Sequence, residues 1–217
     1  MITVYAAYNF PPPLKGIVRD LRVMWALEEL ALPYDFHWMD TSKGEHKLAA
    51  NREINPFGQI PSMRDGAVKL SESGAIIHYL YDKAGRLPKD PVARAETIRW
   101  MLAAINTLEI TFIDILRWDI FWADRAGRDV RYPELLEIAK TRMAELEGAL
   151  GDKPYLLGAE FGPADILMTT VLDFARHQPS VFEGAPVVRA YLARCKARPA
   201  YQAAFAKQGR GPDAKAA

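Results

Sequence analysis

The pattern of the chain changes near residue 85, and this change constrains the fold more than any other feature. Before it, short apolar runs alternate with helical patterns, which is typical of a small α/β domain with a mixed sheet. After it, apolar residues recur at helical spacing and no segment shows a convincing strand pattern. A polar, proline-bearing segment over residues 85–91 separates the two halves. The sequence therefore predicts an α/β domain followed by an all-helical domain.

The first half alternates strand and helix patterns and ends in a hairpin and a helix. The pair Asp65-Gly66 between two short runs is typical of a tight hairpin turn. The expected strands cover residues 2–8, 34–39, 62–64 and 67–70, and the expected helices cover 18–30 and 73–83.

The second half contains only helical patterns. The expected helices cover residues 92–124, 133–150, 163–177, 185–197 and 199–207. We therefore expect domains over residues 1–84 and 92–208, joined by the linker 85–91. The small-residue tail over 209–217 is predicted to be disordered.

Charge and composition exclude several classes of function. The 217 residues carry a formal net charge of +1, which gives no indication of binding to nucleic acid or to an anionic membrane surface. The one cysteine, Cys195, allows no disulfide within the chain and fits a reducing compartment. The N-terminus lacks a signal-peptide pattern, and no apolar run approaches the ~20 residues that span a bilayer. We expect a cytoplasmic protein.

The tripeptide Gln59-Ile60-Pro61 precedes the predicted hairpin. Proline holds the preceding residue in extended geometry, so Ile60 could offer its peptide groups to an added strand of a peptide-like ligand. The alternative is an ordinary proline at the entry to an edge strand.

A second motif, Ser71-Glu72-Ser73-Gly74, opens a predicted helix. Helix N-termini bind carboxylates, Ser73 adds a hydroxyl donor, and Glu72 can take an ammonium group. The two residues together suit an α-amino-acid head group. The alternative is a simple helix cap with an acidic first turn.

The two motifs together resemble the cytosolic glutathione transferase family. The resemblance consists of Asn-Pro-x-Gly-x-Ile-Pro over residues 55–61, then Asp-Gly, then Glu-Ser-x-Ala-Ile-x-x-Tyr-Leu over 72–80. Further matches cover residues 22–29, 32–34, 44–47 and 161–166. The chain looks like a bacterial member with an atypical, proline-rich catalytic loop.

The resemblance implies a thioredoxin-like N-terminal domain that binds glutathione, and an all-helical C-terminal domain. It implies that the Ile60 backbone pairs with the cysteinyl unit, that Pro61 is cis, and that Glu72 and Ser73 hold the γ-glutamyl head.

The resemblance also assigns His46, Lys47 and Gln59 to contacts with the glycyl carboxylate or the peptide backbone of glutathione. The charges agree, because His46 and Lys47 could supply cations for that carboxylate. Without the resemblance, this pair would be taken as solvated loop residues.

The loop after the first strand departs from the family pattern. A thiol ionises near pH ~8.5, so the family places a donor there to stabilise the thiolate. No Ser, Thr or Cys occurs between Thr3 and Thr41, which disfavours transfer through an enzyme cysteine. The candidate activating residues are Asn9, Tyr8, Arg19 and Tyr5, one or more of which would act. Tyr5 could equally pack beneath the sheet, and Arg19 could pair with Asp20.

The sequence gives few indications of the second substrate. By resemblance its pocket lies between the loop and the long helix, and an apolar pocket suits a hydrophobic electrophile. The apolar candidates are Phe10, Leu14, Ile110 and Trp118, with Trp100 and Phe112 also considered. An aromatic stripe on a helix is also typical of a core. By resemblance we expect a homodimer, glutathione as co-substrate, and no metal.

Three functions remain open at this point. The first is a detoxifying transferase that conjugates glutathione to an electrophile or carries out a related glutathione-dependent reaction. The second is a glutathione-binding module without turnover. The third is a structural use of the fold, against which Ile60, Glu72 and Ser73 argue.

Overall fold

The computed structural model describes residues 1–212 of the chain and divides it into two compact units. The first unit joins residues 1–87 to the described part of the segment from Arg198 onward. The second unit comprises Pro88–Ala197. Each unit has its own buried core, and each is described by itself.

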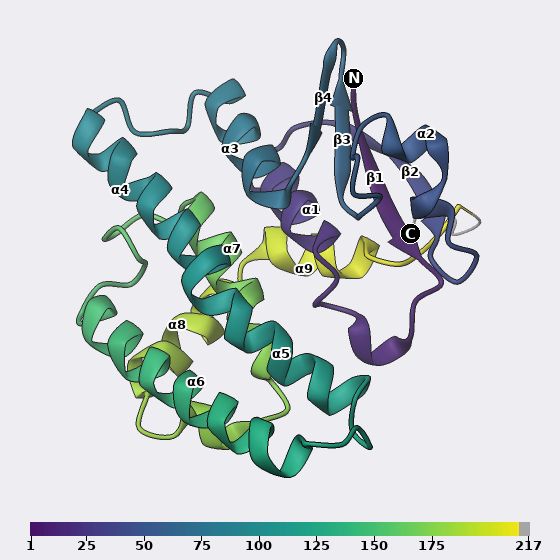
Figure 1. Cartoon of the computed structure of the whole chain (residues 1–217). Helices are drawn as coiled ribbons and strands as arrows, with labels where there is room; N and C mark the ends of the chain where they lie inside the picture. Colours follow the sequence, from purple (N-terminus) through teal and green to yellow (C-terminus); the bar gives the residue numbers. More distant parts are fainter. Residues whose placement is uncertain (213–217) are drawn as a thin grey trace. The chain divides into compact units, whose positions relative to one another are not determined.

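A four-stranded mixed sheet forms the centre of the first unit (Figure 1). Its strands are β1 (Ile2–Tyr8), β2 (Tyr34–Asp40), β3 (Ser62–Asp65) and β4 (Val68–Ser71), in the order β2-β1-β3-β4. Strand β1 runs parallel to β2 and antiparallel to β3, and β3 pairs with β4 as a hairpin. The predicted mixed sheet and its hairpin are confirmed.

The helices of the first unit include one that the sequence assigned elsewhere. They are α1 (Asp20–Glu29), α2 (Ala49–Arg52), α3 (Ser73–Lys83) and α9 (Pro199–Lys207), with 3-10 turns at Pro12–Leu14 and Glu45–Lys47. Helix α1 contacts both α3 and α9. Residues 20–27 of α1 are all buried, so this helix is the centre of the core.

Ion pairs and aromatic packing hold α9 on α1. Arg198 donates to both carboxylate oxygens of Glu29, at 2.6 and 2.7 Å, and the Lys207 ammonium lies 2.6 Å from Glu28. Tyr201 of α9 is buried against α1. The structure thus groups α9 with the α/β unit, whereas the sequence placed residues 199–207 in the helical domain. The buried face of α9 packs against α1, which lies more than a hundred residues earlier in the chain. Helical periodicity indicates that a face is buried but not against which segment it packs.

The predicted tail over 209–217 also differs in part from the structure. Residues 209–212 are described, and Gly209 forms a parallel bridge with Tyr8. The remaining residues, 213–217, lie outside the described part of the chain.

The second unit is helical. Its helices are α4 (Pro91–Leu102), α5 (Glu109–Ile120), α6 (Arg128–Leu150), α7 (Pro163–Leu172) and α8 (Pro186–Lys196), with a π-helical stretch at Ala103–Leu108 and 3-10 turns at Asp173–Ala175 and Pro179–Phe182. Within residues 88–197 the structure contains one isolated bridge, Tyr155 to Gly158, and no strand. All ten residues of α7 are buried, which makes it the central helix of this unit.

Several helix boundaries differ from prediction, and the expected helix over 163–177 is α-helical only to Leu172. The expected helix over 92–124 is continuous in the chain but has a π-helical middle and ends at Ile120. Helix α6 begins at Arg128, so Pro133 lies inside it and not at its first position. Proline is favoured at the first helical position, but Pro133 lies beyond the first turn of α6, where its missing N–H removes one bond of the helix.

Candidate functional site

The sheet register brings the predicted glutathione-binding residues to one end of the first unit. Ser62 pairs with both Tyr5 and Ser71, so the residues just before β3 and just after β4 lie beside each other. Strand β1 runs toward this end and finishes at Tyr8, opposite Asp40 of β2. In Figure 1 this is the end marked by the arrowhead of β1, away from the β3–β4 turn. Topology alone therefore gathers Ile60, Glu72 and the loop after Tyr8.

Ile60 presents an unused peptide group at this end. The Ile60–Pro61 bond is cis, as the resemblance implied. Among residues 1–212, no hydrogen bond outside the regular helices and strands engages the Ile60 N–H or C=O. A peptide ligand can therefore pair with Ile60 in the manner of an added strand.

Two buried asparagines hold the segments on either side of Ile60. The Asn51 amide donates to the carbonyls of His46, at 2.8 Å, and Gln59, at 3.4 Å, and its oxygen accepts from the Ser62 hydroxyl at 2.9 Å. The Asn55 amide donates to the same Gln59 carbonyl at 3.0 Å. Since buried amides of this kind are costly to leave unpaired, these bonds fix the spacing between His46 and Gln59.

Close packing at Gly58 completes this framework. Gly58 has a φ of +59°, and a Cβ there would lie 3.2 Å from the His46 carbonyl oxygen. Arg52 donates to the carbonyls of Lys47 and Pro56, each at 2.9 Å. Only glycine fits both the backbone angle and the narrow gap, so the turn keeps His46 and Lys47 against the β3 end.

His46 and Lys47 differ in charge. The Nδ1 atom of His46 is buried and has no partner among the described residues. Burial, assisted by the Lys47 charge, lowers the pKa of His46 below its ordinary value, so the ring is neutral at pH 7. The exposed Lys47 alone is the cation, which corrects the expectation that both residues supply positive charge.

Glu72 and Ser73 lie at the start of α3. Glu72 has a φ of +68°, an unfavourable backbone region for a residue with a side chain. Such residues persist where neighbouring structure holds them and cluster at functional sites. The Glu72 side chain is exposed and has no partner within residues 1–212. It is therefore available for a ligand ammonium.

Ser73 is backed by an arginine that the sequence analysis did not treat as a site residue. Arg22 of α1 is 2% exposed, and its guanidinium donates to the Ser73 hydroxyl oxygen at 3.2 Å. The serine hydrogen is then free to donate to a ligand. A buried cation beside a helix N-terminus strengthens binding of a carboxylate. A lone charge in the apolar run from Leu21 to Leu27 was the available signal.

The loop candidates Tyr8 and Asn9 have different surroundings. The Asn9 amide donates to both Asp40 carboxylate oxygens, at 3.3 Å, and to the Ser42 hydroxyl at 3.1 Å. Hydrogen bonds from Ser42 first, and also from Asn9, lower the pKa of Asp40 to about 2. The Tyr8 hydroxyl, in contrast, has no hydrogen-bond partner among residues 1–212. Tyr8 is therefore the better placed donor of the two.

Tyr5 and Arg19 occupy other positions. Side chains alternate along a strand, so Tyr5 lies on the opposite face of β1 from Tyr8. Its ring is 4.7 Å from that of His37, and both residues line an open pocket together with Arg64. Arg19 is half-buried at the residue that precedes α1.

The candidates for the second-substrate pocket are divided between the two units. Phe10 and Leu14 belong to the first unit and are half-buried. In the second unit, Ile110 is 60% exposed, whereas Trp118 is 7% exposed and packs edge-on against Trp122. Trp118 is thus mostly core, and the pocket stays a prediction.

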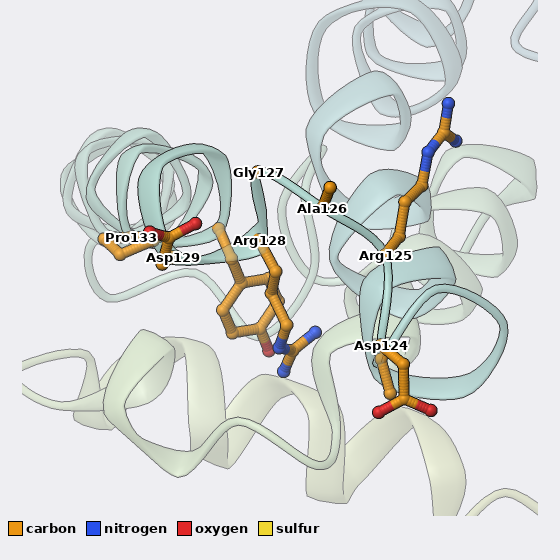
Figure 2. A pocket seen from close by; sticks show the side chains of 9 residues that line it. Asp124, Arg125, Ala126, Gly127, Arg128, Asp129 and Pro133 are labelled. Atoms are coloured by element: carbon orange, nitrogen blue, oxygen red, sulfur yellow. The ribbon is translucent and has the colours of Figure 1, made fainter.

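A separate pocket lies on the helical unit at the turn between α5 and α6 (Figure 2). Its lining runs from Ala123 to Pro133, and Figure 2 shows the side chains of Arg125 and Arg128 pointing in different directions. It contains none of the residues predicted to bind glutathione.

The first unit is a thioredoxin-like domain, and a helical domain follows it. Two family models match the chain: that for the glutathione S-transferase N-terminal domain over residues 21–89, and that for the C-terminal domain over 111–199. The chain belongs to the glutathione S-transferase family.

Known relatives agree in sequence and in structure. A glutathione S-transferase of Hyoscyamus muticus is 30% identical over 201 residues, which cover 85% of this chain and 92% of the relative. A theta-class enzyme from Xanthomonas axonopodis pv. citri, solved with glutathione bound, is 28% identical with a TM-score of 0.78, over 96% of this chain and 98% of that one. A Burkholderia graminis glutathione transferase, solved with two glutathione molecules per subunit, is 25% identical with a TM-score of 0.82, over 97% and 89%. These findings support transferase activity over a binding module without turnover.

Residues 1–212 contain neither a metal-ligand cluster nor a membrane-spanning helix. No group of three or more His, Cys, Asp or Glu side chains could hold a metal ion there. None of the helices in that range has the length and apolar character required to cross a membrane.

Proposed function

We propose that the end of the sheet formed by Tyr8, Ile60 and Glu72 binds glutathione. The observation that carries this proposal is the convergence there of an unpaired peptide group, a helix start backed by Arg22, and an exposed cation. The Ile60 peptide would pair with the cysteinyl unit, and Glu72 with Ser73 would hold the α-amino acid head.

The other end of glutathione would meet the His46 segment. Lys47 would attract the glycyl carboxylate, while the half-buried His46 ring and the Gln59 amide would form hydrogen bonds with it or with the adjacent peptide. The neutral state of His46 makes Lys47 the main electrostatic contact. The donor set thus matches a ligand with an amino-acid head and a carboxylate tail.

We further propose that the Tyr8 hydroxyl stabilises the glutathione thiolate. The thiol would lose its proton to solvent, and a hydrogen bond from Tyr8 would favour the anion. The sulfur would then attack an electrophilic carbon of a hydrophobic substrate, with the sulfur–carbon bond forming as a leaving group departs or a double bond is saturated. Phe10 and Leu14, which are half-buried beside this loop, supply apolar surface for such a substrate.

The test compares Tyr8→Phe with Asn9→Ala. Thiolate absorbance of the glutathione complex is followed against pH, together with kcat and the Kd for glutathione. We expect the wild-type thiol to titrate well below its free value of ~8.5, and Tyr8→Phe to raise that pKa. The loss of one positioned donor should lower kcat about 10²-fold at neutral pH while the Kd changes little.

Asn9→Ala separates the two loop candidates. Because its amide is engaged by Asp40 and Ser42, we expect a smaller effect on the thiol pKa than from Tyr8→Phe. If Asn9→Ala reproduces the full loss and Tyr8→Phe does not, Asn9 is the donor. If bound glutathione stays protonated at neutral pH in the wild type, thiolate activation by this loop is wrong.

We also propose a cytoplasmic, homodimeric enzyme of detoxification. Ile98 and Leu102, one helical turn apart on α4, are 40% and 53% exposed and offer an apolar strip to a second copy. Sedimentation of the purified chain would show a mass of one chain if the dimer proposal is wrong.

A further inference from the structure

The end of α9 is tied into the loop that carries the candidate activating residues. Gln208 follows α9 directly and is 1% exposed. Its side-chain oxygen accepts from the Gly16 N–H at 2.7 Å, and its amide donates to the Val18 carbonyl at 3.0 Å and to Asp20 Oδ1 at 2.6 Å. One buried side chain thereby holds three points along the second half of the loop and the start of α1.

The carboxylate of Asp20 extends this network to the sheet. Asp20 is fully buried, and its second oxygen accepts from the N–H of Ala7, the residue before Tyr8, at 2.8 Å. Ala7, just before the loop, and Gly16, within it, therefore both donate hydrogen bonds to the same Gln208–Asp20 pair. These bonds fix the orientation of the Gln208 amide group. Asp20 accepts on both oxygens, so the Gln208 nitrogen must face Asp20 and its oxygen must face the Gly16 N–H.

The residues after Gln208 contact Tyr8 and Phe10. The last residue of β1 that pairs with β3 is Tyr5. Beyond Tyr5 the same edge of β1 is open, and there Gly209 forms a bridge with Tyr8. A Cβ on Gly209 would lie 2.8 Å from Phe10 Cζ, and one on Gly211 would lie 2.9 Å from Tyr8 Cδ2. Both glycines have φ near +73°, so the backbone can approach the two rings only without side chains.

We propose that Gln208 is a positioning residue for thiol activation, and that Gly209 and Gly211 fix the Tyr8 ring for contact with the sulfur. The proposal rests on the proposed function. Gln208 does not touch glutathione in this arrangement. It acts by holding the loop to Asp20 while Gly209 and Gly211 pack on the rings of Phe10 and Tyr8.

The experiment replaces Gln208 by leucine, which has a similar shape but no polar atoms, and measures the thiol pKa of bound glutathione, kcat and the glutathione Kd. We expect the thiol pKa to rise by about half a unit or more, and kcat at neutral pH to fall about threefold or more in consequence. The Kd should stay within about twofold, because Gln208 bonds to Gly16, Val18 and Asp20 and to none of Glu72, Ser73 and Lys47. Arg210→Ala is the matched control, since Arg210 lies in the same segment, is exposed and bonds only back to α9.

A second variant covers the case in which Gln208→Leu does not fold. Gly211→Ala removes no hydrogen bond but pushes against the Tyr8 ring, so it should raise the thiol pKa and lower kcat with the Kd retained. An unchanged thiol pKa in either folded variant overturns the proposal, as does an equal change in Arg210→Ala. Failure of the wild type to bind glutathione would instead refute the proposed function, so the two failures can be told apart.

Discussion

The hairpin region, residues 46–73, and the loop after β1, residues 9–19, border the same end of the sheet but are held in place differently. In the hairpin region most of the supporting bonds are local: Asn51 reaches His46 and Ser62, which are 5 and 11 residues away, and the bond from Arg22 to Ser73 is the longer-range addition. The loop depends on Gln208, which is 192 residues from Gly16, and on Asp40, which is 31 residues from Asn9.

This difference implies that the binding of glutathione and the activation of its thiol depend on different parts of the chain. The local framework fixes the groups that would hold the two ends of glutathione, so binding should survive changes at the far end of the chain. The loop carries the candidate thiol donor, and it takes its shape from the last helix. Changes in α9 and changes near Asn51 should therefore affect different steps.

The largest effect is expected from Asn51→Ala, which tests whether the hairpin region is a self-contained frame. Asn51 is 3% exposed, and its loss removes the side-chain partner of the His46 carbonyl and of the Ser62 hydroxyl, while the Gln59 carbonyl keeps its bond from Asn55. We expect a loss of about 4 kcal/mol in the free energy of unfolding, measured by denaturant titration. Glutathione affinity should fall in the fraction that remains folded.

The exposed Asn106→Ala is the control for that variant, with a change of no more than about 0.5 kcal/mol. A change below about 1 kcal/mol for Asn51→Ala would mean that the hairpin region depends on more distant contacts, as the loop does.

The next largest effect is a pH dependence of the free energy of unfolding, and it concerns the contacts that hold the loop after β1. Burial raises the pKa of Asp20 from 3.8 to about 6. Between these two values the folded state keeps a proton that the unfolded chain has released, so stability contributed by this group is present at low pH and lost as pH rises to about 6. We expect the wild type to lose about 3 kcal/mol relative to Asp20→Asn between pH 4 and pH 7.

Denaturant titrations of both proteins across this range measure the difference directly. Asp35→Asn, at an exposed position of β2, controls for the removal of one carboxylate. A difference that stays flat with pH would show that burial does not raise the pKa of Asp20.

The smallest effect is expected from Lys47→Met, which probes the glycyl end of the proposed site. Lys47 is exposed, so its attraction for a carboxylate is screened by water and salt. We expect about fivefold weaker glutathione binding at low ionic strength, with the difference shrinking as salt is added. Calorimetry at two salt concentrations would measure it, with the exposed Lys69→Met of β4 as the control. Equal losses in the two variants would remove Lys47 from the site.

Much of the candidate site could be predicted from the sequence because its signals are local. The run from Asn55 to Pro61, the Asp65-Gly66 turn and the Glu72-Ser73 helix start are adjacent in the chain, and turn chemistry places them. The positive φ of Glu72 and the buried partner of Ser73 gave no comparable signal, since they depend on how α1 packs beside α3.

By itself, the sequence determined the α/β half and the helical half, since periodicity and turn residues act over a few positions, and its motifs led to the proposal of glutathione binding. Only the tertiary structure decided that α9 belongs with the α/β unit, that His46 is neutral, and that Gln208 supports the loop beside Tyr8. Burial and long-range hydrogen bonds set these features, because they depend on which distant segments meet once the core has formed.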